Sequence, residues 1–375
     1  MKIVYCIDSI AGIGGIQRVT VSKANALSSV PGYTVWIVVA DNSGESCFPL
    51  SGSVHFMDLA VNYYEDDWKS KLYVLKGIIY KRRIHRKRLS TALKTIQPDV
   101  VVSVGQSEKF FLPFIRGRWK TVREFHFTRN YRQMQAHSAF YRLLAWLGDQ
   151  ADSLVLRKYD RIVVLTQEDK DSHWRSSDKV IVIPNPIELP PEEKLSDTRR
   201  LRVISVGRLT YQKNYASLIR SYAEVAGRFP DWELDIFGDG EEMASLSRLV
   251  ADLHCQDRVF LRGATKDVWP ELSQSSLFVM SSRFEGFSMA LLEAMSCGLP
   301  VVSYACPCGP KDIIREGIDG FLVPPGDESM LADRLFRLIE DDDLRKRMSL
   351  AARERVNDFL LEKVIKMWMN LFDRL

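Results

Sequence analysis

The sequence has 375 residues, of which 46% are hydrophobic and 27% are charged, and its formal net charge is +4. This length predicts two domains of about 150 to 200 residues each, and the composition excludes a disordered chain and a fibrous repeat. Six cysteines without paired CxxC spacing favour reduced thiols. We expect a cytoplasmic protein that does not span a membrane, because it lacks a secretion signal and any run of about 18 uncharged apolar residues.

Short runs rich in valine and isoleucine alternate with longer helical patterns along both halves of the chain. In the first half they are residues 3–7, 34–39, 100–104 and 161–165. In the second half they are residues 202–206, 233–237, 259–262, 277–280 and 300–303. This alternation is typical of βαβ units and a parallel sheet. The sequence therefore predicts an α/β fold with two Rossmann-like, doubly wound domains.

A glycine-rich sequence, GIGGIQR at residues 12–18, follows the first predicted strand and opens a helix. Gly14 and Gly15 would let the backbone approach a phosphate closely, and the helix N-terminus would offer N–H groups to it. A dinucleotide fingerprint needs a third glycine where Gln17 stands, which disfavours an NAD site. A tight structural turn is an equal alternative for this loop.

A strongly basic segment starts at Lys76 and ends at Lys94, with eight Lys or Arg residues and no acid. Ile79, Tyr80 and Leu89 are among the apolar residues between the cations. Such a helix suits an anionic membrane surface, where each cation contributes about 1 kcal/mol. We predict peripheral binding to the inner face of the cytoplasmic membrane. A solvated helix is the alternative, and nucleic acid is disfavoured because no base-stacking module is evident.

Two apolar stretches in the same half, residues 110–115 and 140–147, allow two interpretations. Either they form a surface for an acceptor or for lipid, or they belong to the ordinary core.

Four prolines fall within the sequence PNPIELPPEEK at residues 184–194. Proline interrupts both helices and continuous strands. We therefore predict an N-terminal domain at 1–184, a hinge linker at 185–198 and a C-terminal domain at 199–355.

A second loop, GRLTYQKN at residues 207–214, again stands after a predicted strand and before a helix. Arg208 and Lys213 in this loop could embrace a diphosphate, Arg208 by its planar fork and Lys213 as a point charge. Such a clamp would stabilise the charge that develops on a leaving diphosphate. Two solvated surface cations are the alternative.

Two glutamates, Glu285 and Glu293, stand in the otherwise apolar sequence FEGFSMALLE at residues 284–293. On a helix their carboxylates would lie on the order of 10 Å apart, comparable to the span of a diphosphate from sugar to ribose. Each could then bind a different hydroxyl-bearing ring. Because charged residues are rarely buried without a partner, a purely structural role is disfavoured.

Taken together, Gly14-Gly15, the 207–214 loop, the two glutamates and AMSCGLPVV at residues 294–302 resemble family 4 of the retaining glycosyltransferases. The resemblance extends to VIPNP at 182–186 and EGIDGFLVPPGD at 316–327, and covers nearly the whole chain. It implies the GT-B fold, in which two Rossmann-like domains face each other across a cleft and the last helix, here residues 356–375, packs back on the first domain. CPCGPKDII at residues 306–314 is similar to the branch that builds bacterial exopolysaccharide, capsule or lipopolysaccharide.

For the donor, the resemblance implies that Arg208 and Lys213 hold the diphosphate, Glu285 contacts the sugar hydroxyls and Glu293 holds the ribose. Backbone N–H groups near the start of the helix would bind phosphate oxygens, so that neither a metal ion nor a cofactor is required. The implied donor-binding residues are Gly14, Gly15, Arg208, Lys213, Glu285, Gly286, Phe287, Ser288 and Glu293.

His126, in REFHF at residues 123–127, follows a short strand where the family commonly carries a histidine that faces the reacting sugar. The resemblance implies that His126 hydrogen-bonds the donor sugar or steadies charge, and that Glu124 and His126 contact the acceptor. The flanking sequence departs from the commoner His-Asp form, which leaves the role of His126 open, and a structural role is the alternative. The expected catalytic residues are Glu285, His126, Arg208 and Lys213.

The reaction implied by the resemblance retains the anomeric configuration, because the acceptor attacks on the face from which the nucleotide departs. The donor phosphate can then take the acceptor's proton. The expected donor is a UDP sugar rather than a GDP sugar, and the expected acceptor is a glycan or lipid-linked glycan. Alternatives are a non-catalytic glycan-binding or scaffold protein, another sugar-nucleotide enzyme such as an epimerase, and an NAD-dependent dehydrogenase.

Overall fold

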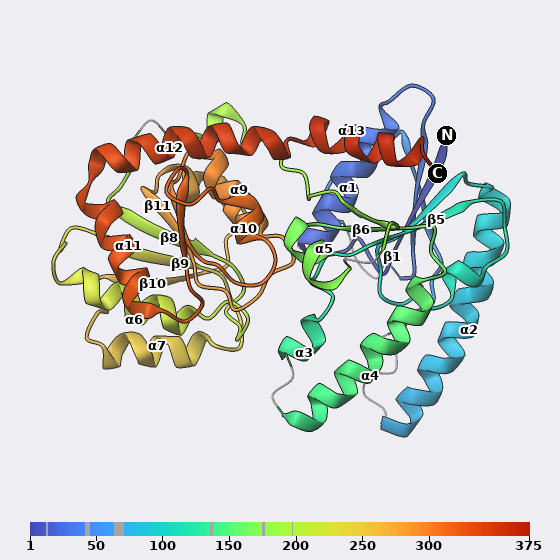
Figure 1. The fold of residues 1–375 in the computed structure, drawn as a ribbon, viewed down its shortest axis with the longest axis horizontal. Coiled ribbons are helices and arrows are strands. Elements are labelled where there is room, and N and C mark those ends of the chain that lie inside the picture. The colour runs from blue at the N-terminus through green and yellow to red at the C-terminus, as the bar shows by residue number, and fades with distance from the viewer. Residues whose placement is uncertain (13, 42–45, 64–70, 136–137, 175–176, 197) are drawn as a thin grey trace. The chain divides into compact units, whose positions relative to one another are not determined.

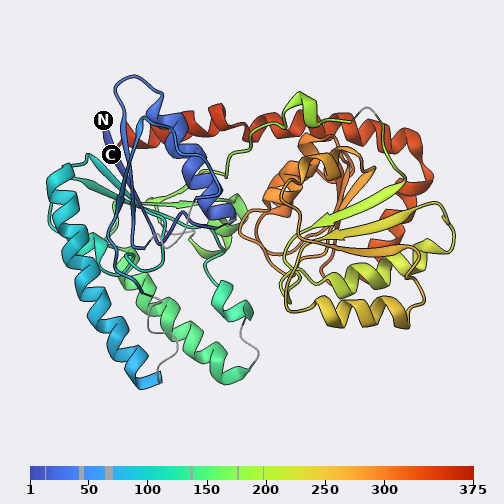
Figure 2. The ribbon, with the colours of Figure 1, turned by 180° about the vertical axis from the view of Figure 1, so that it is seen from behind.

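The computed structural model describes the whole chain except residues 13, 42–45, 64–70, 136–137, 175–176 and 197, and for residues 71–78 it describes the backbone alone. The chain divides into two compact units. Unit 1 contains Met1–Leu165, Ser172–Pro186 and Leu361–Leu375, and unit 2 contains Thr166–Asp171 and Ile187–Leu360. Each unit is built around its own sheet (Figures 1 and 2).

A seven-stranded parallel sheet forms the centre of unit 1, in the order β3-β2-β1-β4-β5-β6-β7. Its strands are β1 (Lys2–Ile7), β2 (Thr34–Val39), β3 (Val54–Asp58), β4 (Val100–Ser103), β5 (Lys120–Glu124), β6 (Arg161–Val164) and β7 (Val180–Val182). Its helices are α1 (Gly15–Ser28), α2 (Lys71–Ile96), α3 (Tyr131–Gln135), α4 (Ala139–Leu156) and α13 (Leu361–Phe372), and α5 (Gln167–His173) follows β6.

Alternation along the strands gives unit 1 a core on each face of its sheet. Ile3 and Tyr5 of β1 pack in a core with residues of α1 and α13, whereas Val4 and Cys6 pack in a second core with residues of α2. Unit 1 is therefore doubly wound, with helices covering both faces.

A six-stranded parallel sheet forms the centre of unit 2, in the order β10-β9-β8-β11-β12-β13. Its strands are β8 (Arg202–Val206), β9 (Glu233–Phe237), β10 (Val259–Gly263), β11 (Leu277–Met280), β12 (Val301–Tyr304) and β13 (Gly320–Val323). Its helices are α6 (Tyr215–Ala226), α7 (Met243–Asp252), α8 (Trp269–Ser273), α9 (Met289–Ser296), α10 (Pro310–Ile313), α11 (Glu328–Glu340) and α12 (Asp342–Val356).

The predicted α/β fold with two doubly wound parallel sheets is confirmed. β2, β8, β9 and β11 have the predicted bounds, and the other predicted strands differ by one residue at an end or at both ends. The valine- and isoleucine-rich runs missed β3, β5, β7 and β13, although a short strand was expected before His126, where β5 lies. β3, β7 and β13 lie at a sheet edge. β3 contains His55 and Asp58, and β7 has only three residues.

The last helix, α13, belongs to unit 1 although the chain has traversed unit 2 before reaching it. Val364, Trp368 and Phe372 are buried in the core that also contains residues of α1 and β1. The two ends of the chain accordingly lie close together in Figure 1.

Candidate active site

The loop between β8 and α6 carries the predicted diphosphate cations. Arg208 is exposed, Lys213 is partly buried, and Asn214 adopts a left-handed φ of 54° immediately before the helix. Arg283, from the loop after β11, holds this turn: its Nη2 donates to Asn214 Oδ1 at 2.7 Å, and its backbone N donates to Gln212 O at 2.8 Å. The loops after two neighbouring strands therefore fix each other.

A close backbone contact sets the path of the same loop at its start. A Cβ on Gly238, which follows β9, would lie 1.9 Å from the carbonyl O of Gly207, which follows β8. The adjacent Leu209 N donates to Asp239 O at 2.9 Å. Only glycine at position 238 leaves room for the carbonyl O of Gly207, the residue directly before Arg208.

Glu285 lies beside the second cation of the loop. Its side chain is buried, with 8% exposed, and its Oε1 accepts a hydrogen bond from Lys213 Nζ at 2.7 Å. Because a buried carboxylate needs a compensating partner, this pair explains how Glu285 can be buried. The pair also joins a residue predicted to hold the diphosphate to one predicted to bind the donor sugar.

The two predicted glutamates do not share one helix. α9 begins at Met289 with Ser288 as its N-cap, so Glu285 and Gly286 lie in the loop before it. The separation of about 10 Å assumed a helical rise across the whole stretch, and that assumption is wrong. Glu293 lies on the helix itself and is largely buried.

The N-terminus of α9 is a second polar feature of this region. The first turn of an α-helix leaves backbone N–H groups without intrahelical partners, and these attract anions. Ser288 Oγ is buried and has no hydrogen-bond partner among the described residues. The loops and helix of unit 2 thus carry seven predicted site residues: Arg208, Lys213, Glu285, Gly286, Phe287, Ser288 and Glu293.

The sheet order explains why these loops meet. The first strand of unit 2, β8, lies between β9 and β11. The chain passes from β8 outward through β9 to β10 and then returns to β11 on the other side of β8, so the strand order reverses at β8. In open α/β sheets ligands bind beyond the carboxyl ends of the strands at such a switch point. The 207–214 loop and the 281–288 loop both follow strands at this point.

Unit 1 has the equivalent switch point between β1 and β4, and the predicted glycine loop stands there. Gly14 is the N-cap of α1, which begins at Gly15. Asp8, at the end of β1, accepts hydrogen bonds from the backbone N of Gln106 at 2.7 Å and of Ser107 at 3.1 Å, in the loop after β4.

Glu124 and His126 lie together at the end of β5, within a buried ionic cluster. His126 Nε2 lies 3.3 Å from Glu124 Oε1, and the same oxygen accepts a hydrogen bond from Lys23 Nζ of α1. Lys23 Nζ also lies 4.4 Å from the centroid of the Trp368 ring. Burial raises the pKa of Glu124, but the charges of Lys23 and His126 overcome this effect and lower the pKa to about 2. Glu124 is therefore an ionised, buried carboxylate.

Sequence reasoning missed two further groups at the unit 1 switch point. Glu108 is buried; its Oε1 accepts a hydrogen bond from Ser103 Oγ at 2.7 Å and lies 3.8 Å from Arg123 Nη1. Burial and the nearby charge of Asp8 raise the pKa of Glu108 to about 7. A single acid in a polar loop gave no signal in the sequence, whereas the position of Asp8 at the end of the first strand could have indicated it.

Two family models match consecutive parts of the chain. The model of Glycosyltransferase Family 4 matches residues 13–189, and the model of Glycosyl transferases group 1 matches residues 187–355. The chain belongs to glycosyltransferase family 4. It is accordingly a glycosyltransferase, and the predicted family resemblance is confirmed.

This family 4 glycosyltransferase is similar to relatives over nearly its full length. It is 28% identical to an uncharacterized glycosyltransferase of Haemophilus influenzae, over 99% of each chain. It is 27% identical to the amylovoran biosynthesis glycosyltransferase of Erwinia amylovora, also over 99% of each. Among solved structures, Anabaena HepE in complex with UDP-glucose superposes with a TM-score of 0.75 over 100% of both chains at 18% identity. The last similarity supports the GT-B fold.

The basic segment of this glycosyltransferase forms much of α2, and its side chains are described from Ile79 onward. Ile79 and Tyr80 are exposed, as a membrane-facing helix requires. Leu89 and Leu93 are fully buried in the core of unit 1, so the interpretation of these two residues as part of a membrane-facing surface is wrong. Lys76 belongs to the residues whose side chains are not described.

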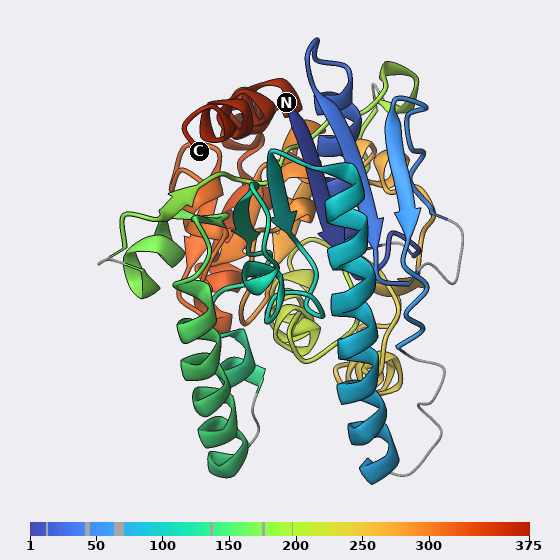
Figure 3. The ribbon, with the colours of Figure 1, turned by 90° about the vertical axis from the view of Figure 1, so that its right-hand side faces the viewer.

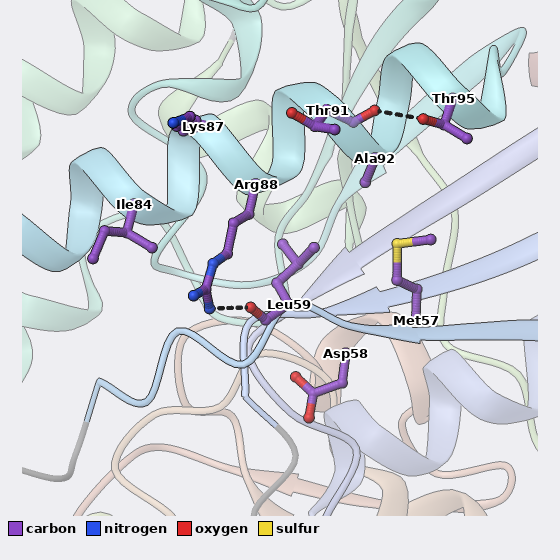
Figure 4. Close-up of a pocket in the computed structure, with 9 residues that line it drawn as sticks. All are labelled: Met57, Asp58, Leu59, Ile84, Lys87, Arg88, Thr91, Ala92 and Thr95. Carbon is purple, nitrogen blue, oxygen red and sulfur yellow. Dashed lines mark hydrogen bonds between the residues drawn. The ribbon is translucent and has the colours of Figure 1, made fainter.

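A cavity of about 580 Å³ lies between α2 and β3 of the enzyme (Figure 4). Arg88 of the basic segment donates from Nη1 to the carbonyl O of Leu59 at 2.7 Å and of Ala60 at 2.6 Å, beside this cavity. Arg88 thus ties the end of β3 to α2. None of the residues predicted to bind donor or acceptor lines this cavity.

Proposed function

We propose that the enzyme is a retaining, metal-independent glycosyltransferase that transfers a sugar from a nucleotide diphosphate sugar to a glycan or lipid-linked glycan of a bacterial surface polysaccharide. A UDP sugar is the preferred donor. The observation that carries the proposal is the Lys213–Glu285 pair at the switch point of unit 2, with Nζ and Oε1 2.7 Å apart.

The chemistry of the loop residues supports a diphosphate at this point. Lys213 Nζ and the exposed guanidinium of Arg208 supply two positive charges, and the N-terminus of α9 supplies backbone N–H groups. These groups would stabilise the charge that builds on the departing diphosphate. In the proposed complex Glu285 shares its contact with Lys213 and accepts hydrogen bonds from hydroxyls of the donor sugar, while Glu293 binds the ribose.

The proposed reaction breaks the bond between the anomeric carbon and the donor phosphate oxygen. The acceptor hydroxyl oxygen forms the new bond on the same face, and its proton passes to the departing phosphate. Neither glutamate then forms a covalent intermediate. We assign His126 to the donor sugar, Glu124 with His126 to the acceptor, and Gly14 and Gly15 to donor binding.

Relatives support the substrate class in this proposal. The Erwinia amylovora relative is named for amylovoran biosynthesis, and the Anabaena structure contains UDP-glucose. We extend a UDP sugar donor and a surface polysaccharide acceptor to this enzyme on that basis. The same acceptor class motivates the proposal that α2 lies against an anionic membrane at the inner face of the cytoplasmic membrane, through residues such as Arg83, Arg86 and Lys87, which are exposed.

The first test is thermal unfolding of the purified protein in EDTA with UDP, GDP and several UDP sugars. A ligand at 100 times its Kd stabilises by about 2.7 kcal/mol, which corresponds to about 5 to 10 °C for a domain of this size. We expect such a shift for UDP in the wild type and in the exposed control Glu354→Gln, and its loss in Glu293→Gln. A shift that appears only when EDTA is replaced by a divalent cation would refute metal independence, and no shift with any nucleotide in either buffer would refute the donor site.

The stereochemistry needs a separate measurement. Once a donor is found by the thermal shift, proton NMR of the fresh product reports the configuration of the new glycosidic bond. An α donor should give an α product. Inversion would contradict the proposed mechanism without affecting the donor site.

A further inference from the structure

Helix α4 has its polar side chains toward unit 1 and its apolar side chains toward solvent. With about 100° between successive residues, Phe140, Leu143, Leu144, Leu147 and Leu154 share one face of the helix. All five are exposed, from 46% for Leu144 to 65% for Phe140. A helix of a water-soluble domain normally has the opposite orientation, so this apolar face requires another explanation.

The opposite face of α4 is held by polar contacts to its neighbours. Asp149 accepts a hydrogen bond from Gln133 Nε2 of α3 at 2.7 Å, and Asp152 lies 3.1 Å from Arg132 Nη2. Asp152 also accepts from Lys109 Nζ at 3.0 Å. These contacts fix which side of the helix faces inward, so that α4 cannot bury its leucines by rotation without breaking them.

The surroundings of this face indicate its partner. The first halves of α2 and α4 both project from the same end of the unit 1 sheet (Figures 1 and 3). Ile79 and Tyr80 of α2 are exposed at this end, followed by the exposed cations Arg83 and Arg86. An apolar face beside a set of cations complements a bilayer with anionic headgroups, because the apolar groups enter the acyl boundary while the cations meet the phosphates.

The composition of α4 fits a helix that lies in the membrane interface. Tyr141 and Trp146 are exposed on the flanks of the apolar face, where amphipathic aromatic rings favour the headgroup level. Among the described residues, no helix combines the length and apolar character needed to cross a bilayer. We propose that the outward face of α4 inserts into the interface of an anionic lipid bilayer and that α2 supplies the electrostatic attraction.

This inference deepens the proposed function, because a lipid-linked acceptor would be met at that bilayer. The two helices contribute differently to the free energy of membrane binding. The contribution of α4 is hydrophobic and independent of salt, whereas that of α2 is electrostatic and is screened by salt.

The test is co-flotation of the full-length protein with vesicles of phosphatidylcholine alone or mixed with phosphatidylglycerol. The variant Leu144→Ser/Leu147→Ser removes apolar groups from the outward face, and the matched control Leu350→Ser removes a leucine that is 71% exposed on α12. Each buried leucine contributes on the order of tenfold to partitioning, so the double variant should bind mixed vesicles at least tenfold more weakly. The control should bind as the wild type does.

A charge variant separates the two helices. Arg83→Gln/Arg86→Gln should weaken binding to mixed vesicles at low salt and leave the residual binding at high salt unchanged. Unchanged binding of the leucine variant would overturn the proposal. So would a wild-type dimer in solution that the leucine variant dissociates, because a second copy would then cover this face. UDP-induced stabilisation should be the same in all four proteins, so its absence from the wild type would count against the donor site alone.

Discussion

Replacing Lys23 by methionine should destabilise unit 1 strongly, because Glu124 would remain as a buried carboxylate without its main counter-charge. Both side chains are 1% exposed, and Trp368 covers Lys23 with its ring centroid 4.4 Å from Nζ. Removing one partner of such a pair costs about 3 to 5 kcal/mol. The lowered pKa of Glu124, about 2 against an ordinary 4.5, corresponds to a similar value of about 3 kcal/mol.

For a unit of this size, that loss corresponds to about 6 to 20 °C in the midpoint of thermal unfolding. The assay is calorimetry at neutral pH on Lys23→Met, Glu124→Gln and the double variant, with the exposed Lys94→Met as the control. We expect the double variant to be more stable than Lys23→Met alone, since the uncompensated charge is gone. The control should lie within about 0.5 kcal/mol of the wild type.

The reasoning would be refuted if the double variant lost as much unfolding free energy as the two single variants lose together. A second outcome would also be informative. If Glu124→Gln unfolds like the wild type but loses transfer to the acceptor, Glu124 acts on the substrate and not on the fold. The pH dependence provides a further check: the stability that Glu124 contributes should be present above its ordinary pKa of 4.5 and be lost as the pH falls toward about 2.

Three further changes have defined outcomes. Gly238→Ala should lower the unfolding midpoint and weaken UDP binding by calorimetric titration, because its Cβ would meet the carbonyl O of Gly207 at 1.9 Å. Lys213→Met should leave the midpoint of the free enzyme lower and abolish the UDP-induced shift, because it removes both the partner of Glu285 and a diphosphate cation. In the wild type the free energy of unfolding should fall by about 3 kcal/mol between pH 4.5 and pH 7, because in this window the carboxyl of Glu108 releases its proton in the unfolded chain and keeps it in the folded one. Glu108→Gln should abolish this decrease, as measured by urea unfolding at each pH.

The sequence patterns were sufficient to recognise the two sheets, because buried parallel strands such as β1 and β11 are nearly continuous apolar runs. The loops that follow these strands could be identified as site candidates for the same reason. The partner of Glu124 could not be predicted from the sequence, since Lys23 is 101 residues away and only the packing of α1 on the sheet brings the two side chains together. The helical extent of the 284–293 stretch was overestimated, although Ser288, a residue type preferred at N-caps, stands directly before the apolar run MALLE and could have indicated the start of α9.

The orientation of α4 shows another limit of sequence patterns. Periodicity can reveal that Phe140, Leu144 and Leu147 share a face, but it carries no information on whether that face points inward. The direction was set by Arg132 and Lys109, which bind the acidic side of the helix from other parts of the chain.

The place of α13 in unit 1 has a consequence for synthesis on the ribosome. Trp368 completes the core around Lys23 and Tyr5, yet it is translated after all of unit 2. Unit 2 can therefore reach its native state while unit 1 still lacks its final helix. The usual order, in which the N-terminal domain folds first, should be reversed here. A nascent chain that ends before Leu361 would carry a folded second unit and a first unit open to chaperones.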